Sequence, residues 1–321
     1  EYQSIGKFRT LPETGQPASF RFAFASSNQT GSEAGVFSEI RYQDPLFFLH
    51  LGNAYSETDV PNELDAWHHL YRQSLDSFTQ AELYRSVPVV YTWDSLDSGQ
   101  SAAHQAYRNF VPHYPLPADA PIEGDENRLN PISQSFSVGR VKFIILDTRT
   151  ARTPADGDSV TLLGDWQWTW LQNEIKSAAL RHPLIFIASS VPFHARKSIS
   201  GTHDHWGYYP SERTRLETWL RDEGISGVSL LSGNGGILAA TVHEGAPGDL
   251  NELQSGMLDA RQEPAIGRWT DGPLLPGPTE EFFGIVDVVD KRSTIEVTFQ
   301  GMNQHGHKRF KSTFSVPDST P

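Results

Sequence analysis

Six apolar segments of strand length alternate with helix-like stretches through residue 233, and most of them run into Gly, Ser, Asn or Asp. Short apolar runs bounded by turn-forming residues are typical of buried strands, and strands that alternate with helices predict an α/β architecture. The strand segments are FRFAFASS (20–27), DPLFFLHLG (44–52), SVPVVYTWD (86–94), RVKFIILD (140–147), HPLIFIASSVP (182–192) and GVSLLSG (227–233). The helix-like stretches are 35–43, 64–75, 165–181 and 211–224.

The last two helix-like stretches and one hairpin carry signals of where they end. Asp165 lies early in the first turn of the third helix, where a carboxylate favours the helix dipole. The fourth helix has Ser211 in the N-cap position and Gly224 in the C′ position. Near the C-terminus, EEFFGIVDVVDKRSTIEVTFQG (280–301) predicts a β-hairpin that turns around Asp290–Lys291. We therefore expect an α/β portion followed by a β-rich region.

Composition narrows the function classes. The 321 residues include 26 basic and 39 acidic ones, and the net charge of −13 argues against nucleic acid or an anionic membrane as the main partner. Mean hydropathy is −0.44 and no apolar run approaches ~18 residues, so no membrane-spanning helix is expected. The chain contains no cysteine, which rules out disulfides, zinc-thiolate sites and thiol nucleophiles. The oligomeric state stays open.

Polar residues follow three of the predicted strands at the points where the strands end. Asn53 follows LHLG, Asp94 follows YTW with Asp97 three residues later, and Asn234 follows LLSG. Ligands of open α/β sheets bind beyond the carboxyl ends of the strands. We therefore expect Asn53, Asp94 and Asn234 to converge at one end of the fold, within ~10 Å of each other.

These junctions, taken in order with SSVPF (189–193) and WGYYPSER (206–213), resemble the alkaline phosphatase D (PhoD-like) metallophosphatases. The resemblance implies a four-layer α/β/β/α metallophosphoesterase-like sandwich of two mixed sheets. It also implies a linker strand and N-terminal extension in residues 1–19, one domain in residues 20–321, and a secreted or cell-envelope location. Further segments that fit the family are FAFASSNQTGS (22–32), ELYRSVPVVYTWD (82–94), FVPHYPLP (110–117) and LDTRTARTP (146–154).

The metal-binding positions of the family are poorly matched. In the family the three junctions read Gly-Asp, Trp-Asp-Asp-His-Asp and Ser-Gly-Asp-x-His, and a Cys that is common at the end of the first strand corresponds here to Ser27. Two multivalent cations held close together repel each other and need several anionic oxygens. We therefore predict no metal site and no other cofactor. The positions that depart from Asp or His are Asn53, Ser95, Leu96, Asn234 and Gly236.

Nine side chains at the edges of these motifs are candidate site residues. Asp94 can act as a general base or cap its own loop, His194 can be a rim histidine, and Arg213 can form an ion pair on its helix. Two His-x-His segments, 203–205 and 305–307, have a zinc-chelating spacing, but no acidic companions are obvious and solvated histidines explain them more simply. The candidate catalytic residues are Tyr55, Asp94, His194 and His205, and the candidate substrate-binding residues are Asn53, Asp97, Tyr208, Arg213 and Asn234.

Two classes of function fit this pattern, and a third stays open. The first is a metal-independent enzyme, of hydrolase or lyase type, that uses the family cleft on an anionic or saccharide small molecule. The second is a non-catalytic pseudo-phosphatase that only binds a ligand. The third is a weakly metal-dependent phosphoesterase. The eight Trp residues invite a sugar-binding interpretation, but core packing explains most of them.

Overall fold

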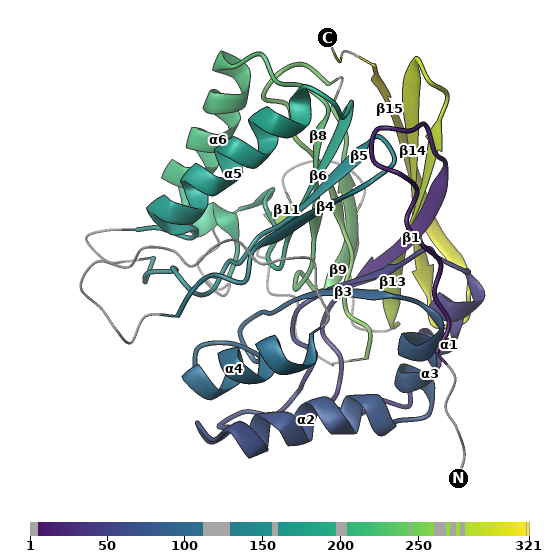
Figure 1. The fold of residues 1–321 in the computed structure, drawn as a ribbon, viewed down its shortest axis with the longest axis vertical. Coiled ribbons are helices and arrows are strands. Elements are labelled where there is room, and N and C mark those ends of the chain that lie inside the picture. The colour runs from purple at the N-terminus through teal and green to yellow at the C-terminus, as the bar shows by residue number, and fades with distance from the viewer. Residues whose placement is uncertain are drawn as a thin grey trace.

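Two mixed β-sheets lie face to face, and helices cover their outer faces (Figure 1). This is the four-layer α/β/β/α sandwich that the sequence predicts. The structure is a computed structural model, and it describes residues 6–111, 129–155, 160–196, 204–243, 245–259, 268–269, 274–276, 280–318 and 320.

The first sheet has the strand order β15-β14-β13-β1-β2-β3. Its strands β1, β2 and β3 run parallel, whereas β13 pairs antiparallel with β1 and starts an antiparallel run through β15. The predicted hairpin is the β13–β14 pair. The strands are β1 (Phe20–Ala25), β2 (Phe48–Leu51), β3 (Val89–Thr92), β13 (Phe282–Asp290), β14 (Thr294–Asn303) and β15 (Lys308–Pro317).

The second sheet has the strand order β12-β9-β10-β8-β6-β5-β4, with β5, β6, β8 and β10 parallel. A separate two-stranded sheet joins β7 (Ala195–Arg196) to β11 (Arg268–Trp269). The strands of the larger sheet are β4 (Gln134–Val138), β5 (Val141–Ile145), β6 (Leu184–Ser189), β8 (Val228–Ser232), β9 (Ile237–Thr241), β10 (Asn251–Gln254) and β12 (Leu274–Pro276).

Phenylalanine rings fill the space between the two sheets. Phe22 of β1 meets Phe143 of β5 and Phe186 of β6, with ring centroids 5.3 and 5.6 Å apart, and Phe47 stacks on Phe22 at 5.2 Å. All four rings are fully buried or nearly so. Because each sheet presents one apolar face, stacking the two sheets removes both faces from water at about 25 cal/mol per Å² of apolar surface.

Helices bury the outer faces of both sheets. Helices α5 (Gly164–Ala179) and α6 (Pro210–Asp222) pack on the second sheet, while α1 (Gly35–Tyr42) and α3 (Thr79–Ser86) pack on the first. Helices α2 (Leu64–Asp76) and α4 (Ser101–Phe110) share a smaller apolar cluster with residues of β3. Within the described parts of the chain, no helix is long and apolar enough to cross a membrane.

All six predicted strands are present, but one predicted helix end is wrong. Helix α6 begins at Pro210 with Tyr209 as its N-cap, so Ser211 lies inside the first turn. Proline suits this first position because its fixed φ matches the helix and no N–H is needed there. Gly224 follows the helix at φ +67°, as the C′ prediction requires. Helices α3 and α4 were not anticipated.

Residues 6–19 cross the sandwich without forming a strand. The N–H of Lys7 donates to the carbonyl of Arg85, and the N–H of Gly15 donates to the carbonyl of Gly139. These contacts attach the segment to the body of the fold at both of its ends. The division of the chain at residue 19 stays a prediction.

Candidate functional site

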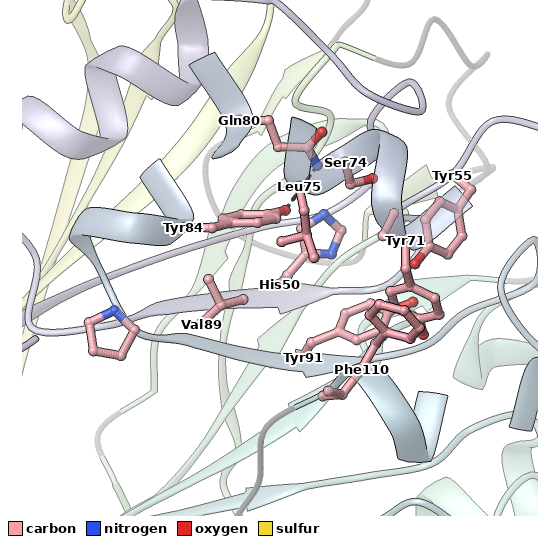
Figure 2. Close-up of a pocket in the computed structure, with 13 residues that line it drawn as sticks. His50, Tyr55, Tyr71, Ser74, Leu75, Gln80, Tyr84, Val89, Tyr91 and Phe110 are labelled. Atoms are coloured by element: carbon pink, nitrogen blue, oxygen red, sulfur yellow. Dashed lines mark hydrogen bonds between the residues drawn. The ribbon is translucent and has the colours of Figure 1, made fainter. Parts of the chain in front are cut away.

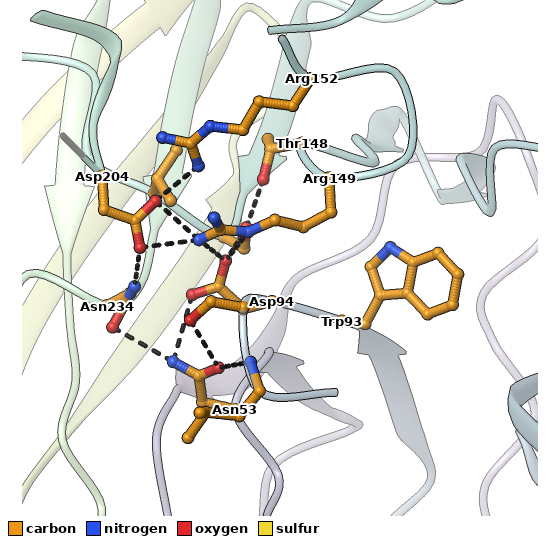
Figure 3. A network of polar contacts seen from close by, with 12 residues as sticks. Asn53, Trp93, Asp94, Thr148, Arg149, Arg152, Asp204 and Asn234 are labelled. Atoms are coloured by element: carbon orange, nitrogen blue, oxygen red, sulfur yellow. Dashed lines mark hydrogen bonds and ion pairs between the residues drawn. The ribbon is translucent and has the colours of Figure 1, made fainter. Parts of the chain in front are cut away.

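Asn53, Asp94 and Asn234 meet at one end of the sandwich, just beyond β2, β3 and β8 (Figure 3). The Asn53 Nδ2 donates to Asp94 Oδ2 at 3.2 Å and to Asn234 Oδ1 at 3.3 Å. The Asn53 Oδ1 accepts from the backbone N–H of Leu96 at 3.0 Å. The three residues therefore converge as predicted, and Asn53 is hydrogen-bonded directly to the other two.

The backbone at these junctions is left-handed, which explains part of the sequence there. Gly52, Asn53 and Asn234 have φ values of +92°, +52° and +50°. Asn enters the left-handed region more readily than most residues, and Gly enters it without cost. A Cβ on Gly52 would lie 2.7 Å from the backbone N of Asp94, so only glycine allows β2 and β3 to end this close together.

Arg149 contributes a cation to this end of the fold. Its Nε donates to Asp94 Oδ1 at 2.5 Å, and Ser190 Oγ donates to the same oxygen at 2.9 Å. Asp147, fully buried at the end of β5, accepts from the N–H groups of Arg149 and Thr150 at 2.9 and 3.0 Å. A carboxylate that accepts from backbone two and three residues ahead fixes a turn. Asp147 therefore holds the turn that directs Arg149 at Asp94.

Asp204 lies on the other side of Arg149 and completes the group. It accepts from Arg149 Nη2 at 2.8 Å, from Arg152 Nη1 at 2.6 Å and from Asn234 Nδ2 at 2.9 Å (Figure 3). Asp94 is fully buried, whereas the side chains of Arg149, Arg152 and Asp204 are 11%, 15% and 18% exposed. We call Asp94, Arg149, Arg152 and Asp204 the arginine–carboxylate cluster. Solvent reaches it on the side of the arginines and Asp204.

The two carboxyl groups of the cluster have pKa values shifted in opposite directions. Burial raises the pKa of Asp94 to about 7, with Arg149 opposing the shift and repulsion from Asp204 and Asp97 adding to it. Burial also acts on Asp204, but the pull of Arg149 and Arg152 is larger and lowers its pKa. With both arginines charged and Asp204 ionised, the cluster has a net charge of +1 while Asp94 is protonated and of zero once it ionises.

Asp97 is also buried, behind Asp94, and its pKa is raised as well. Its Oδ2 accepts from the Tyr91 hydroxyl and, at 3.2 Å, from the backbone N–H of Ala54, while its Oδ1 has no partner in the described parts of the chain. Burial raises the pKa of Asp97 to about 6 against the effect of these hydrogen bonds. Asp97 therefore supports the loop that carries Asn53 without contacting the arginines directly.

The remaining candidates from the sequence lie outside the cluster. Tyr55 lines a separate aromatic cavity with Tyr71 and Tyr91. His194 Nε2 is 2.8 Å from the carbonyl of Leu250, and its backbone N–H donates to Glu252. These contacts connect Tyr55 and His194 to other parts of the fold, and their catalytic roles stay predictions.

Three further candidates are used in local structure around the start of α6. His205, fully buried, accepts from the N–H of Gly207 at 3.1 Å and caps the short 3₁₀ helix Trp206–Tyr208. Tyr208 packs on the His205 ring, with centroids 4.7 Å apart. Arg213 Nε lies 3.4 Å from Glu217 Oε1, and Arg213 Nη1 donates to the carbonyl of Phe193 at 3.2 Å. The ion pair on the helix, one of the two alternatives for Arg213, is thus formed.

Of the two His-x-His segments, only the second lies wholly within the described residues. His203 lies outside the described residues, and the rings of His305 and His307 are 6.0 Å apart on the β14–β15 turn. Among the residues that the structure describes, no group of three or more His, Asp or Glu side chains is arranged to hold a metal ion.

Sequence reasoning missed the arginines and Asp204. Arg149 and Arg152 belong to LDTRTARTP, which was noted only as fitting the family, and Asp204 lies inside the segment read as a histidine pair. The available signal was the position of Arg149, two residues after Asp147, where the apolar segment 140–147 ends. A polar residue that follows a strand in this way is a candidate site residue for the same reason as Asn53 or Asp94.

Comparisons with known proteins point to one family. A family model described as PhoD-like phosphatase matches residues 79–256. Alkaline phosphatase D of Bacillus subtilis (strain 168) is 25% identical, over 73% of this chain and 49% of its own length, so the chain spans about half of that relative. The solved structure titled "Structure of PhoD" matches 98% of this chain and 73% of its own, with a TM-score of 0.69 and 18% identity. That structure shares the fold.

Proposed function

The chain belongs to the PhoD-like phosphatase family, and we propose that it is a hydrolase for a small substrate with an anionic group, held by arginines instead of by a metal pair. A phosphate ester is the substrate class that the family description and the name of the relative support. A saccharide has less support, because neither the family description nor the name of the relative points to one. A secreted or cell-envelope location belongs to the same proposal.

The observation that carries the proposal is the position of Arg149. Its guanidinium lies between the carboxylates of Asp94 and Asp204, where three strand ends converge. Arg152 adds a second guanidinium on the solvent side. Guanidinium groups match the oxygens of phosphate in charge and geometry, and two of them can share one anion.

The residues at this centre do not fit a pair of multivalent cations. Asp94 Oδ1 already accepts from Arg149 Nε at 2.5 Å, so a cation bound there would face a guanidinium at close range. Asn53 and Asn234 offer neutral amide oxygens, and Leu96 and Gly236 offer no ligand atom in their side chains. The donor set supplies too little negative charge for such a pair.

The same residues can bind an anion and move a proton. An anionic group that enters from solvent meets Arg152 and Arg149 and competes with Asp204 for them. Asp94, with a pKa of about 7, can hold or release a proton near neutral pH, which suits a general acid or base. Arg149 neutralises the carboxylate that remains after Asp94 releases its proton.

One observation favours the non-catalytic alternative. Asp94 is fully buried, and its two oxygens already accept from Arg149, Ser190 and Asn53. A carboxyl group whose acceptors are all used within the protein is suited to holding a site together. The second candidate function is therefore a binding module that retains an anion without turning it over.

Hydrolysis assays on metal-depleted protein separate these functions. Protein treated with EDTA and desalted is assayed with p-nitrophenyl phosphate, bis(p-nitrophenyl) phosphate and a p-nitrophenyl glycoside, with and without Mn²⁺, Ca²⁺, Fe³⁺ or Zn²⁺. We expect phosphate-ester turnover that neither EDTA nor added metal changes. Arg152→Gln should lower kcat/KM at least about 10-fold, because it removes a charged contact with the anion. Arg140→Gln, at the far end of β5, is the matched control and should retain activity.

The other outcomes identify the alternatives. Saturable phosphate binding without turnover of any ester indicates the binding module. Hydrolysis that EDTA abolishes and metal restores supports a metal-dependent phosphoesterase and contradicts the proposal. The double variant Asn53→Asp with Asn234→Asp should also fail to gain metal-dependent activity, since positions 95, 96 and 236 still lack ligands.

A further inference from the structure

A cavity of about 480 Å³ lies between α2, α3 and the strands β2 and β3 (Figure 2). No residue of the arginine–carboxylate cluster lines it. Its walls include the aromatic side chains of Tyr55, Tyr71, Tyr84, Tyr91 and Phe110. The Tyr71 ring stacks on Phe110 with centroids 5.1 Å apart, and Tyr55 meets Tyr71 edge-on at 5.1 Å. Cavities of this size with aromatic walls are typical binding sites for small organic molecules.

The described lining of this cavity carries no charge. It contains no Lys, Arg, Asp or Glu side chain, and its only histidine is neutral, because burial lowers the pKa of His50 to about 3. The His50 ring is also saturated with hydrogen bonds: Nδ1 accepts from the N–H of Gly52 at 3.3 Å, and Nε2 lies 2.6 Å from Asn28 Oδ1. A charged ligand would lose its hydration here without meeting a counter-charge.

One polar atom in the wall lacks a partner. Ser74 is 5% exposed, and its Oγ is buried with no hydrogen-bond partner in the described parts of the chain. Tyr71, Ser74 and Leu75 have the spacing of one helix face, and all three line the cavity. An alanine at position 74 would pack there without the cost of an unpaired hydroxyl. A ligand group that forms a hydrogen bond with this hydroxyl would remove that cost.

The cavity opens to solvent beside α2. Leu75 lines it and is 44% exposed, so a molecule can enter past this side chain. The inner wall belongs to the strands that end in the candidate site, since His50 precedes Asn53 by three residues and Tyr91 precedes Asp94 by three. A bound molecule would pack against both strands.

We propose that this cavity binds a neutral, mainly aromatic small molecule whose one hydroxyl or carbonyl group forms a hydrogen bond with Ser74. The aromatic walls provide the affinity, the uncharged lining selects against ions, and Ser74 sets the orientation. The site is separate from the arginine–carboxylate cluster, and it does not depend on the hydrolase function proposed above.

Three matched probes test the chemistry of the site on the full chain at neutral pH. The probes are 2-naphthol, naphthalene and 2-naphthoate, which share a ring system and carry a hydroxyl, no polar group and a carboxylate. We expect calorimetric or fluorescence titration to show 1:1 binding of 2-naphthol, weaker binding of naphthalene, and affinity for 2-naphthoate at least about 100-fold lower than for 2-naphthol. Equal affinity for 2-naphthol and 2-naphthoate would overturn the proposal, as would the absence of saturable binding by 2-naphthol.

Two variants locate the binding in this cavity. Ser74→Ala should weaken 2-naphthol about 3–10-fold and leave naphthalene unchanged, because only the hydroxyl loses a partner. Ser177→Ala, at an exposed position of α5, is the matched control and should change neither affinity. Val89→Phe should fill the cavity and abolish the binding of both 2-naphthol and naphthalene. If circular dichroism shows that Val89→Phe does not fold, the Ser74 comparison decides: unchanged 2-naphthol affinity in Ser74→Ala contradicts the proposed site.

Discussion

Replacing Arg149 by Met should destabilise the fold by an amount that grows with pH. An unfolded aspartate loses its proton near pH 3.9, whereas the buried Asp94 keeps its proton up to a pKa of about 7. The folded state therefore binds more protons than the unfolded state in this interval, and the contribution of Asp94 to stability is lost as pH rises. Above a pH of about 7 the loss levels off in the parent protein, because folded Asp94 ionises beside Arg149.

The magnitude follows from the role of Arg149 in this titration. Arg149 opposes the effect of burial on Asp94, so its removal raises the pKa of Asp94 further and stability continues to fall with pH in the variant. Each pH unit above about 7 then adds about 1.4 kcal/mol to the difference in the free energy of unfolding between the parent protein and Arg149→Met. This difference reaches ~2 kcal/mol by a pH of about 8.5. A further ~1–3 kcal/mol, nearly constant with pH, comes from the hydrogen bond that Asp204 loses.

Urea denaturation at pH values of about 6 and about 8.5 measures this difference. Arg140→Met is the matched control, because Arg140 is equally buried at 11% exposure and also contacts two carboxylates, Asp290 and Asp318. The Arg140 guanidinium helps to lower the pKa of both, so they stay ionised over this interval and the cost of Arg140→Met should not change. The reasoning is refuted if Arg149→Met costs the same free energy at both pH values. Adding Asp94→Asn to Arg149→Met should remove the pH dependence.

Three further predictions concern single side chains. Asp147→Ala should cost at least ~3 kcal/mol in urea denaturation, because it leaves the buried N–H of Ile132 and the part-buried N–H groups of the turn at Arg149 without acceptors; a loss under ~1 kcal/mol would show that the turn holds by itself. Gly52→Ala should cost at least ~3 kcal/mol by the same measurement, since φ +92° strains alanine and its Cβ meets the backbone of Asp94; a neutral result would contradict the observed closeness of the two strand ends. Ser74→Ala should raise the free energy of unfolding by ~0.5–1 kcal/mol, and a loss of stability would reveal a partner for that hydroxyl.

Much of the fold follows from short stretches of sequence. The apolar runs that became β1, β2, β3, β5, β6 and β8 are local signals, because a strand buried on both faces is a nearly continuous apolar run. The convergence of Asn53, Asp94 and Asn234 also follows from sequence, since each residue comes directly after a strand and strand ends share an edge. Helix α6 shows the limit of such signals, because Pro210 begins the helix where Ser211 looked like a cap.

The partners of each polar side chain were decided by the tertiary structure. Asp94 and Asp204 are 110 positions apart in sequence, and only the stacking of the two sheets brings Arg149 between them. Two histidines show how packing decides the role of a side chain. His205 caps a short helix with its ring nitrogen, whereas His50 lines an aromatic cavity, where burial keeps it neutral. A polar residue in a loop looks the same in sequence whether it faces a ligand, a backbone group or another charge. Its protonation and its contacts depend on burial and on neighbours from distant segments, and these exist only once the chain has folded.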